Sequence, residues 1–257
     1  MKPVLLFFTF IACTFFCFSQ KSKKDEFFLF DKQGKNITDF KKTSYFIRVR
    51  YVNDTSWKID TYWNAGPMQM SEICKDNKGE TRHGQYAAYR KSGYLDSAGK
   101  YVNGQMVDDW DYYNDTGRIV MQKTFDNGVL VKTRDILKEQ EEKDDEEEEN
   151  EDNAFMKVEK ESEFKGGIKQ WSAYLTKNLR YPEVAIQTNT AGMVVVSFIV
   201  GTDGSVNDIL LFKSLEYSLD DESMRMIKES PKWEPAHQNG KKVRSYKRQP
   251  IVFALTR

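Results

Sequence analysis

The sequence predicts two folds in series: an all-β N-terminal domain of stacked hairpins and a compact α+β C-terminal domain. Three observations support this: a hairpin-like pattern recurs in the first half, an acidic run divides the chain, and mixed helix and strand patterns follow that run. A length of 257 residues suits two modest domains. Lys plus Arg and Asp plus Glu each number 39, so the net charge gives no reason to expect nucleic acid as a partner.

Residues 1–19 are typical of a signal peptide for export. The apolar run at residues 4–18 is shorter than the roughly 20 residues that span a bilayer, and small residues precede Gln20 at the positions that a signal peptidase reads. We therefore expect cleavage after Ser19 and a mature protein in the periplasm. The alternatives are an uncleaved inner-membrane anchor facing the periplasm, with at most weak membrane association, and lipid attachment at Cys13. Cleavage would leave Cys74 as the single cysteine, without an intrachain disulfide and with core burial as its expected place.

The N-terminal domain, residues 20–135, contains an internal repeat. A shift of 24 residues, the separation of Tyr86 and Trp110, superposes residues 86–104 on residues 110–128, and both copies end in Asn-Gly. Asn-Gly supplies the positive φ angles that a tight hairpin needs, so each repeat predicts one hairpin. A lone hairpin cannot bury its aromatic face, and neighbouring hairpins are therefore expected to stack into an elongated twisted sheet. Alternating patterns at residues 27–37 and 44–63 extend the all-β domain toward the N-terminus.

The spacing of glycine and aromatic residues in residues 61–131 resembles MORN-type repeats. The residues that carry the resemblance are the Gly84 to Tyr89 spacing, Asn103-Gly104, and the glycines in phase at Gly93 and Gly117. The resemblance implies a scaffold, a spacer or a docking surface. Packing within the sheet is the expected role of the aromatic side chains. The alternative is a surface for a ligand or a partner, with these contact residues: Tyr86, Tyr89, Trp110 and Tyr113.

Residues 136–156 are expected to form an acidic linker. Residues 139–152 hold 11 acids among 14 residues and no apolar residue. Repulsion between like charges keeps such a run extended and prevents it from burying surface. A metal-binding role is disfavoured, because an unfolded run lacks the preset geometry of a cation site.

The C-terminal domain, residues 157–257, follows the order helix, hairpin, helix, strand. Apolar spacing predicts a helix over about residues 167–179, and Pro182 fits the first turn of a short second helix. A β-branched run after Gly192 is followed by a hairpin partner across Asp203-Gly204. Ser218 is expected to cap the next helix, and residues 242–255 form the final strand.

This domain resembles the C-terminal domain of the TonB family of periplasmic energy transducers. The resemblance covers roughly residues 164–257 and rests on an ordered set of marks: Tyr181-Pro182, Gly192, Asp203-Gly204, Leu219-Asp220, Trp233, Pro235-Ala236, Asn239-Gly240-Lys241, Val243, Pro250 and Phe253. It implies a three-stranded antiparallel sheet with helices on one side. It also implies that the last strand is an edge that accepts an extended segment of an outer-membrane receptor or another envelope protein.

The final strand has sequence features of an exposed edge. Charged side chains occupy its first half, and Pro250 cannot donate a ladder hydrogen bond. The simpler interpretation is that these residues only protect the edge from aggregation. The residues predicted to bind a partner are Arg244, Ser245, Tyr246, Lys247, Arg248 and Gln249. Trp233, Pro235 and Phe253 are expected to be structural.

The chain departs from the energy-transducer pattern at its N-terminus. The hydrophobic segment is short, the whole chain holds six prolines, and no long Pro-rich spacer is evident. A partner-binding module of a TonB-type transport system is therefore the leading hypothesis. The alternatives are a membrane-anchored energy transducer and a structural envelope scaffold that acts through the repeats.

Nothing in the sequence indicates catalysis or a cofactor. The two histidines are His83 and His237, and the patterns typical of hydrolases, zinc sites, redox pairs and phosphate-binding loops do not occur. We expect neither an enzyme nor a metal site. The transported substrate, the receptor and the oligomeric state cannot be read from the sequence.

Overall fold

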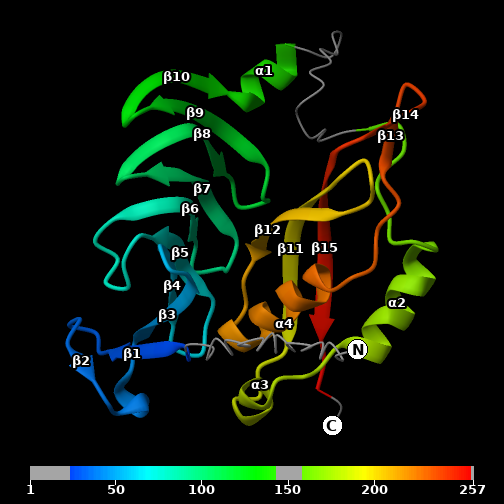
Figure 1. Cartoon of the computed structure of the whole chain (residues 1–257). Helices are drawn as coiled ribbons and strands as arrows, with labels where there is room; N and C mark the ends of the chain where they lie inside the picture. The colour runs from blue at the N-terminus through cyan, green and yellow to red at the C-terminus, as the bar shows by residue number, and fades with distance from the viewer. Residues whose placement is uncertain (1–23, 143–157, 256–257) are drawn as a thin grey trace, which may run out of the picture.

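A computed structural model of the chain describes residues 24–142 and 158–255 (Figure 1). The predicted signal peptide, its cleavage site after Ser19 and residues 143–156 of the predicted linker lie outside the described residues. Two sheets dominate the described part. A long sheet coloured blue to green holds the first half of the chain, and a small sheet flanked by helices holds the second half.

The first half is one antiparallel sheet of ten strands in the described part. From edge to edge its order is β10-β9-β8-β7-β6-β5-β4-β3-β1-β2, so most neighbours along the chain are neighbours in the sheet. This confirms an all-β N-terminal domain, with a long antiparallel sheet that agrees with stacked hairpins. Its strands are β1 Glu26–Phe30, β2 Asn36–Ile37, β3 Tyr45–Asn53, β4 Ser56–Trp63, β5 Met68–Cys74, β6 Arg82–Tyr89, β7 Leu95–Val102, β8 Gln105–Tyr113, β9 Ile119–Asp126 and β10 Val129–Asp135, and a 3-10 turn, η1, spans Phe40–Lys42.

The two Asn-Gly steps form the hairpin turns that the repeat predicts. Asn103 has φ 51° and Gly104 φ 81°, and the β7–β8 hairpin turns there. Asn127 and Gly128 have φ 46° and 85°, and they join β9 to β10. Asparagine and glycine tolerate this left-handed region, which explains why both copies of the repeat end with the same dipeptide.

The start of the predicted acidic linker differs from the expectation of extended chain. Residues Ile136–Glu142 form helix α1. Arg134 at the end of β10 donates to the carboxylate of Glu139 in this helix, with Nη2 2.5 Å from Oε2. An ion pair with the sheet therefore fixes the first helical turn, and charge repulsion alone did not predict it.

The second half is an α+β domain in the predicted order. Its three-stranded sheet has the order β12-β11-β15 with antiparallel neighbours. The predicted fold class of this domain is therefore confirmed. Its elements are α2 Gly167–Asn178, α3 Glu183–Gln187, β11 Gly192–Val200, β12 Val206–Lys213, α4 Tyr217–Lys228, β13 Ala236–Gln238, β14 Lys241–Val243 and β15 Ser245–Phe253.

Two local predictions in this domain were wrong. Ser218 does not cap α4, because Glu216 precedes the helix and its carboxylate accepts from the backbone N–H groups of Ser218 and Leu219. The last strand is also interrupted. Lys241–Val243 turns back on Ala236–Gln238 as a small separate hairpin, and only Ser245–Phe253 joins the main sheet.

The two faces of the three-stranded sheet have different neighbours. Alternate residues of β11, among them Val196 and Phe198, are fully buried on the face where α4 packs and where Trp233 meets the Phe198 ring. Ser197 and Ile199 point to the opposite face, which lies toward the ten-stranded sheet. This alternation is the ordinary two-residue period of a strand.

The two domains share one hydrophobic core, which the sequence did not indicate. Tyr62, Met68 and Leu95 of the long sheet belong to the same buried cluster as Leu219 and Phe198 of the C-terminal domain. Hydrogen bonds cross the contact as well. The Tyr89 hydroxyl donates to the carbonyl of Leu211 at 3.0 Å, and the Met68 backbone N–H donates to Ser214 Oγ at 2.7 Å.

An ion-pair network also joins the domains. Arg48 and Arg50 of β3 both contact the carboxylate of Asp221 in α4, and Arg48 Nη1 lies 2.5 Å from Asp221 Oδ2. Arg50 also pairs with Asp60, which is fully buried. Tyr217 at the start of α4 packs edge-on against Phe46 and Tyr62 beside these groups. The repeat sheet therefore holds the first turn of α4 through both apolar and charged contacts.

Candidate functional site: the β15 edge and the interdomain cleft

Strand β15 lies at an edge of the three-stranded sheet, with β11 as its bonded neighbour. In Figure 1 it is the red strand on the side away from the long sheet. Its register with β11 is regular from Ser245 opposite Val200 to Phe253 opposite Gly192. In the described part of the chain no strand bonds to its other side.

Pro250 shows which backbone groups of β15 point to the free side. It stands opposite Val195 within the ladder, and a proline is tolerated there when its missing N–H would have pointed away from the neighbouring strand. In an antiparallel ladder the N–H and C=O groups of one residue point to the same side, and successive residues alternate. The backbone groups of Tyr246 and Arg248 therefore point to the free edge, and Pro250 ends the run of available donors.

The side chains of β15 alternate between two environments. Ser245, Ile251 and Phe253 are buried on the helix face, and Ser245 Oγ donates to Ser162 Oγ at 3.1 Å. Tyr246 and Arg248 point to the other face, where they line a cleft. Five of the six predicted residues lie in β15. Ser245, Lys247 and Gln249 share the helix-side parity, and Tyr246 and Arg248 share the other, whereas Arg244 directly precedes the strand.

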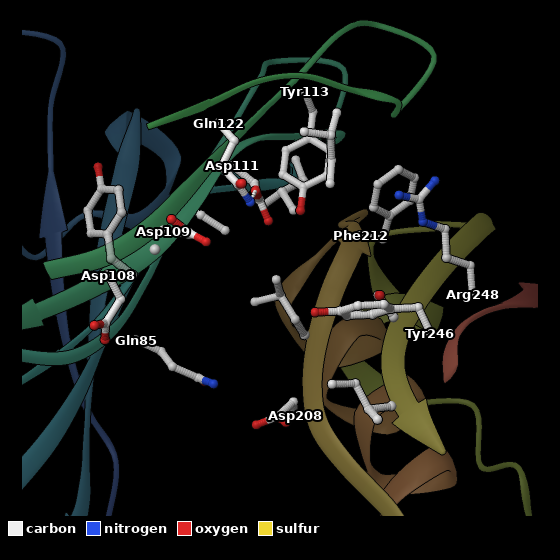
Figure 2. Close-up of a pocket in the computed structure, with 18 of the residues that line it drawn as sticks. Gln85, Asp108, Asp109, Asp111, Tyr113, Gln122, Asp208, Phe212, Tyr246 and Arg248 are labelled. Carbon is white, nitrogen blue, oxygen red and sulfur yellow. Dashed lines mark hydrogen bonds between the residues drawn. The ribbon is translucent and has the colours of Figure 1, made fainter. Parts of the chain in front are cut away.

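The cleft lies between the open face of the small sheet and strands β6–β10, and its volume is about 620 Å³ (Figure 2). Leu95, Ile119, Ile199, Leu210 and Phe212 supply apolar lining. The polar lining is uneven: four carboxylates, of Asp108, Asp109, Asp111 and Asp208, stand against two guanidinium groups, of Arg134 and Arg248. Because Arg134 is paired with Glu139, the cleft wall made by the repeats is predominantly acidic.

Asp111 is the most enclosed of these acids. Gln122 on the neighbouring strand donates its amide to Asp111 Oδ1 at 3.0 Å. Burial raises the pKa of Asp111, and the nearby charge of Asp109 adds to the effect. Charge on Asp111 also acts across the cleft, since Asp111 and Asp208 both help to raise the pKa of Tyr246 after burial, which is the main cause.

Arg248 lies in a different part of the cleft. Its guanidinium carbon is 3.7 Å from the centroid of the Phe212 ring, close enough for a cation–π contact. Burial lowers the pKa of Arg248, and the Tyr113 phenol acts in the opposite direction. Among the described residues no carboxylate forms an ion pair with Arg248, so its positive charge has no counter-ion within the chain described.

The four aromatic residues considered as repeat-face contacts fall into two groups. Tyr89 is buried with its hydroxyl on Leu211, and the ring of Tyr113 meets Phe212 edge-on. Both therefore pack in the contact between the domains. Tyr86 and Trp110 pack on each other and on Tyr101 within the repeat sheet, and Tyr86 also lines the cleft.

The sequence analysis missed the acidic wall of the cleft. Its signal was present in β8, where Asp108, Asp109 and Asp111 interrupt a strand that otherwise carries aromatic side chains. Acids are depleted in strands, so three of them in one strand indicate a solvated or functional face. Among the residues that the structure describes, no group of three or more His, Cys, Asp or Glu side chains could hold a metal ion.

None of the described helices is long and apolar enough to span a membrane. Cys74 is buried, and burial raises its thiol pKa to about 12. This is the structural role expected for it.

Comparisons with known proteins match the C-terminal domain. The family model described as Gram-negative bacterial TonB protein C-terminal matches residues 177–255. The solution NMR structure of the C-terminal domain of TonB from Helicobacter pylori is similar at 28% sequence identity, covering 35% of this chain and 80% of that chain with a TM-score of 0.27. No curated protein matches. The family match confirms the resemblance of residues 177–255, which include β15, to the TonB C-terminal domain.

Proposed function

We propose that this chain is a periplasmic binding protein of a TonB-type transport system, and that its β15 edge accepts an extended segment of an outer-membrane receptor. One observation carries the proposal: β15 has a free edge with the backbone groups of Tyr246 and Arg248 toward it. This edge lies within the residues that match the TonB C-terminal family. Strand addition needs such an unpaired row of N–H and C=O groups.

The repeats support the choice of β15 over the opposite edge of the sheet. At the end of β12, Lys213 forms an antiparallel bridge with Tyr94, and the Ser214 N–H donates to the carbonyl of Gly93 at 2.9 Å. A turn of the repeat sheet therefore occupies the end of the β12 edge. The repeats act as a fixed wall of the binding domain, which is a closer association than a spacer or a separate docking platform. The proposed role is binding without catalysis.

Backbone-methylated peptides test strand addition most sharply. A peptide is taken from the periplasmic N-terminal segment of a TonB-dependent receptor of the same bacterium, and single N-methyl groups are placed along it. An added strand bonds through alternate residues, so methyl groups at one parity should reduce affinity at least about tenfold, while the other parity tolerates them. Titration of fluorescently labelled peptides measures the affinity for each position of the methyl group. Equal losses at both parities would contradict strand addition.

Two experiments separate the alternatives, the peptide titration for the first and a mass measurement for the second. A structural scaffold that acts through the repeats predicts no binding of receptor segments to β15. If the protein is a membrane-anchored transducer, the full-length chain should be found in the inner membrane. If it is a periplasmic binding protein, the chain should be soluble and its intact mass should match a chain that starts at Gln20. Intact mass and fractionation of the expressed protein distinguish these two.

A further inference from the structure

We propose that β15 and the repeat wall together select a charge pattern in the added strand: an acidic side chain beside Arg248 and a basic side chain two residues away, beside Tyr246. This inference rests on the proposed function and deepens it by naming the chemistry of the partner. It assigns a role to the cleft in Figure 2, which neither the family match nor the repeats explain.

The first step is the geometry of an added strand. A strand bonded to the free side of β15 would continue the pleat, so alternate side chains would stand on the cleft face beside Tyr246 and Arg248. Facing residues of neighbouring strands place their Cβ atoms about 4.5–5.5 Å apart, and opposite charges at that separation stabilise the pair. Tyr246 and Arg248 would therefore each contact the side chain of one facing residue of the partner strand.

The second step is the unpaired charge of Arg248. Its guanidinium lies on the Phe212 ring, and no described carboxylate pairs with it. The Arg248 side chain is exposed, so solvent screens its charge, but a carboxylate that an added strand brings beside it would form a charge-assisted hydrogen bond. The backbone of Arg248 faces the free edge, so its nearest neighbour in an added strand would be positioned to supply that carboxylate.

The third step is the opposite charge around Tyr246. Asp111 from the repeats and Asp208 from β12 line the same cleft as Tyr246 and help to raise the pKa of its phenol against the opposing effect of Arg244, whereas the Arg248 guanidinium lies apart from them on the Phe212 ring (Figure 2). The cleft is therefore divided along β15 into an acidic part at Tyr246 and a basic part at Arg248. A basic side chain beside Tyr246 would enter the acidic part, where Asp111 accepts only a neutral amide among the described residues.

The simpler interpretation is that these charges keep the cleft hydrated and prevent association. It predicts that binding depends on β strand propensity and backbone groups alone. The two interpretations differ in whether the order of charges in a partner matters, and this can be measured with defined peptides.

The test uses five fluorescein-labelled, acetylated ten-residue peptides of alternating Val and Thr. In four of them two consecutive members of the Thr face become Glu and Lys, Lys and Glu, Glu and Glu, or Lys and Lys. The fifth keeps Thr at both positions. Fluorescence anisotropy measures their affinity for the full-length protein at low salt. One of the two mixed orders should bind about fivefold tighter than the neutral peptide, and both like-charge peptides should bind more weakly than that order.

Which mixed order is preferred follows from the direction of the added strand. Glu before Lys fits an antiparallel strand, and Lys before Glu fits a parallel one, because either places Glu beside Arg248. Equal affinity of all five peptides, or of both mixed orders, would overturn the inference.

Variants of the protein locate the effect. Arg248→Glu should change the preference at this position from Glu to Lys, so that the peptide with two lysines binds tightest. Asp111→Asn should remove most of the affinity that Lys beside Tyr246 contributes. Lys228→Gln at the exposed end of α4 is the control on the C-terminal domain, because it lies outside β15, and Asp126→Asn is the control on the repeats. If the controls change affinity as much as Arg248→Glu does, the charge pattern is not read at this site.

The outcome for the proposed function is read separately, from hydrogen exchange of β15 in the presence of each peptide. Protection of the Tyr246 and Arg248 amides without any charge preference would overturn this inference alone. Absence of both protection and binding would overturn the proposed function, and this inference with it.

Discussion

The two edges of the three-stranded sheet differ in what meets them. At the β12 edge the repeat turn approaches so closely that a Cβ built on Gly93 would lie 2.1 Å from the Ser214 carbonyl oxygen. At the β15 edge the described chain offers no strand, and Pro250 with charged neighbours lines it. The repeats therefore make the C-terminal domain asymmetric, since they cover the end of one sheet edge and leave the β15 edge free in the described part of the chain.

Gly93→Ala should be the most damaging single change at the closed edge. Gly93 has φ 85°, and the added Cβ would clash with the backbone of Ser214, which cannot move away without breaking the bridge at Lys213. We expect a loss of about 3 kcal/mol or more in the free energy of unfolding. Urea unfolding measures it.

Gly104→Ala is the matched control for this clash. Gly104 has nearly the same φ, 81°, but nothing lies within 4 Å of its added Cβ. Its cost should be limited to backbone strain, about 1 kcal/mol. Equal losses for the two variants would mean that close contact between the repeats and β12 contributes nothing to stability.

Asp220 makes the closed side sensitive to pH. This fully buried carboxyl accepts from Ser214 Oγ at 2.5 Å, and burial raises its pKa from 3.8 to about 7. The folded protein then binds more protons than the unfolded chain between about pH 4 and about pH 7. Its contribution to stability is therefore present at low pH and is lost as the pH rises through about 7.

We expect Asp220→Asn to flatten this dependence. The wild-type free energy of unfolding should fall relative to the variant by about 2–3 kcal/mol across this range, on the order of 1 kcal/mol per pH unit. Urea unfolding at a series of pH values measures the difference. Parallel curves for the two proteins would show that Asp220 ionises as it does in the unfolded chain.

Asp221→Asn should have an intermediate effect. The variant removes the charge that holds both Arg48 and Arg50, but the Asp221 side chain remains 33% exposed, so solvent screens part of the interaction. A cost of about 1–2 kcal/mol is expected. Glu80→Gln removes a largely exposed partner of Lys78 and should cost under about 0.5 kcal/mol. If both variants cost the same, the network does not join the domains.

Arg248→Gln at the open edge should change stability less than any of the changes at the contact between the domains. It removes one contact with Phe212, for which about 0.5–1 kcal/mol is typical, and breaks no ion pair. Thermal unfolding should therefore change little, while peptide affinity changes as proposed above. A large loss of stability would place Arg248 in the core that joins the domains instead of at a binding surface.

Local patterns predicted the individual elements better than their association. The repeat period and the Asn-Gly turns predicted the hairpins around Gly104 and Gly128, because turn chemistry is encoded in adjacent residues. The shared core was not predictable in this way. Tyr89 and Leu211 are far apart in the chain, and an aromatic residue in a repeat looks the same whether it packs on its own sheet or on another domain.

The sequence predicted the edge strand of the candidate site but not the cleft beside it. Pro250 and the charges before it indicated an edge strand, since both features act within one strand. The acidic wall facing that strand depends on where β8 lies relative to β15, which no local pattern in the sequence specifies. Glu216 caps α4 in place of Ser218 because the helix begins at Tyr217, earlier than expected, and the Glu216 carboxylate accepts from the N–H groups of Ser218 and Leu219.

Hydrogen exchange of the β15 amides shows whether this edge is free and accepts a partner strand. The amides of Tyr246 and Arg248 point to the free edge and should exchange quickly in the protein alone, then become protected when a receptor segment binds. Gln249, whose amide is expected to bond to β11, should be protected in both states. Protection of all three amides in the free protein, or no change at Tyr246 and Arg248 upon binding, would contradict a free edge that accepts a partner strand.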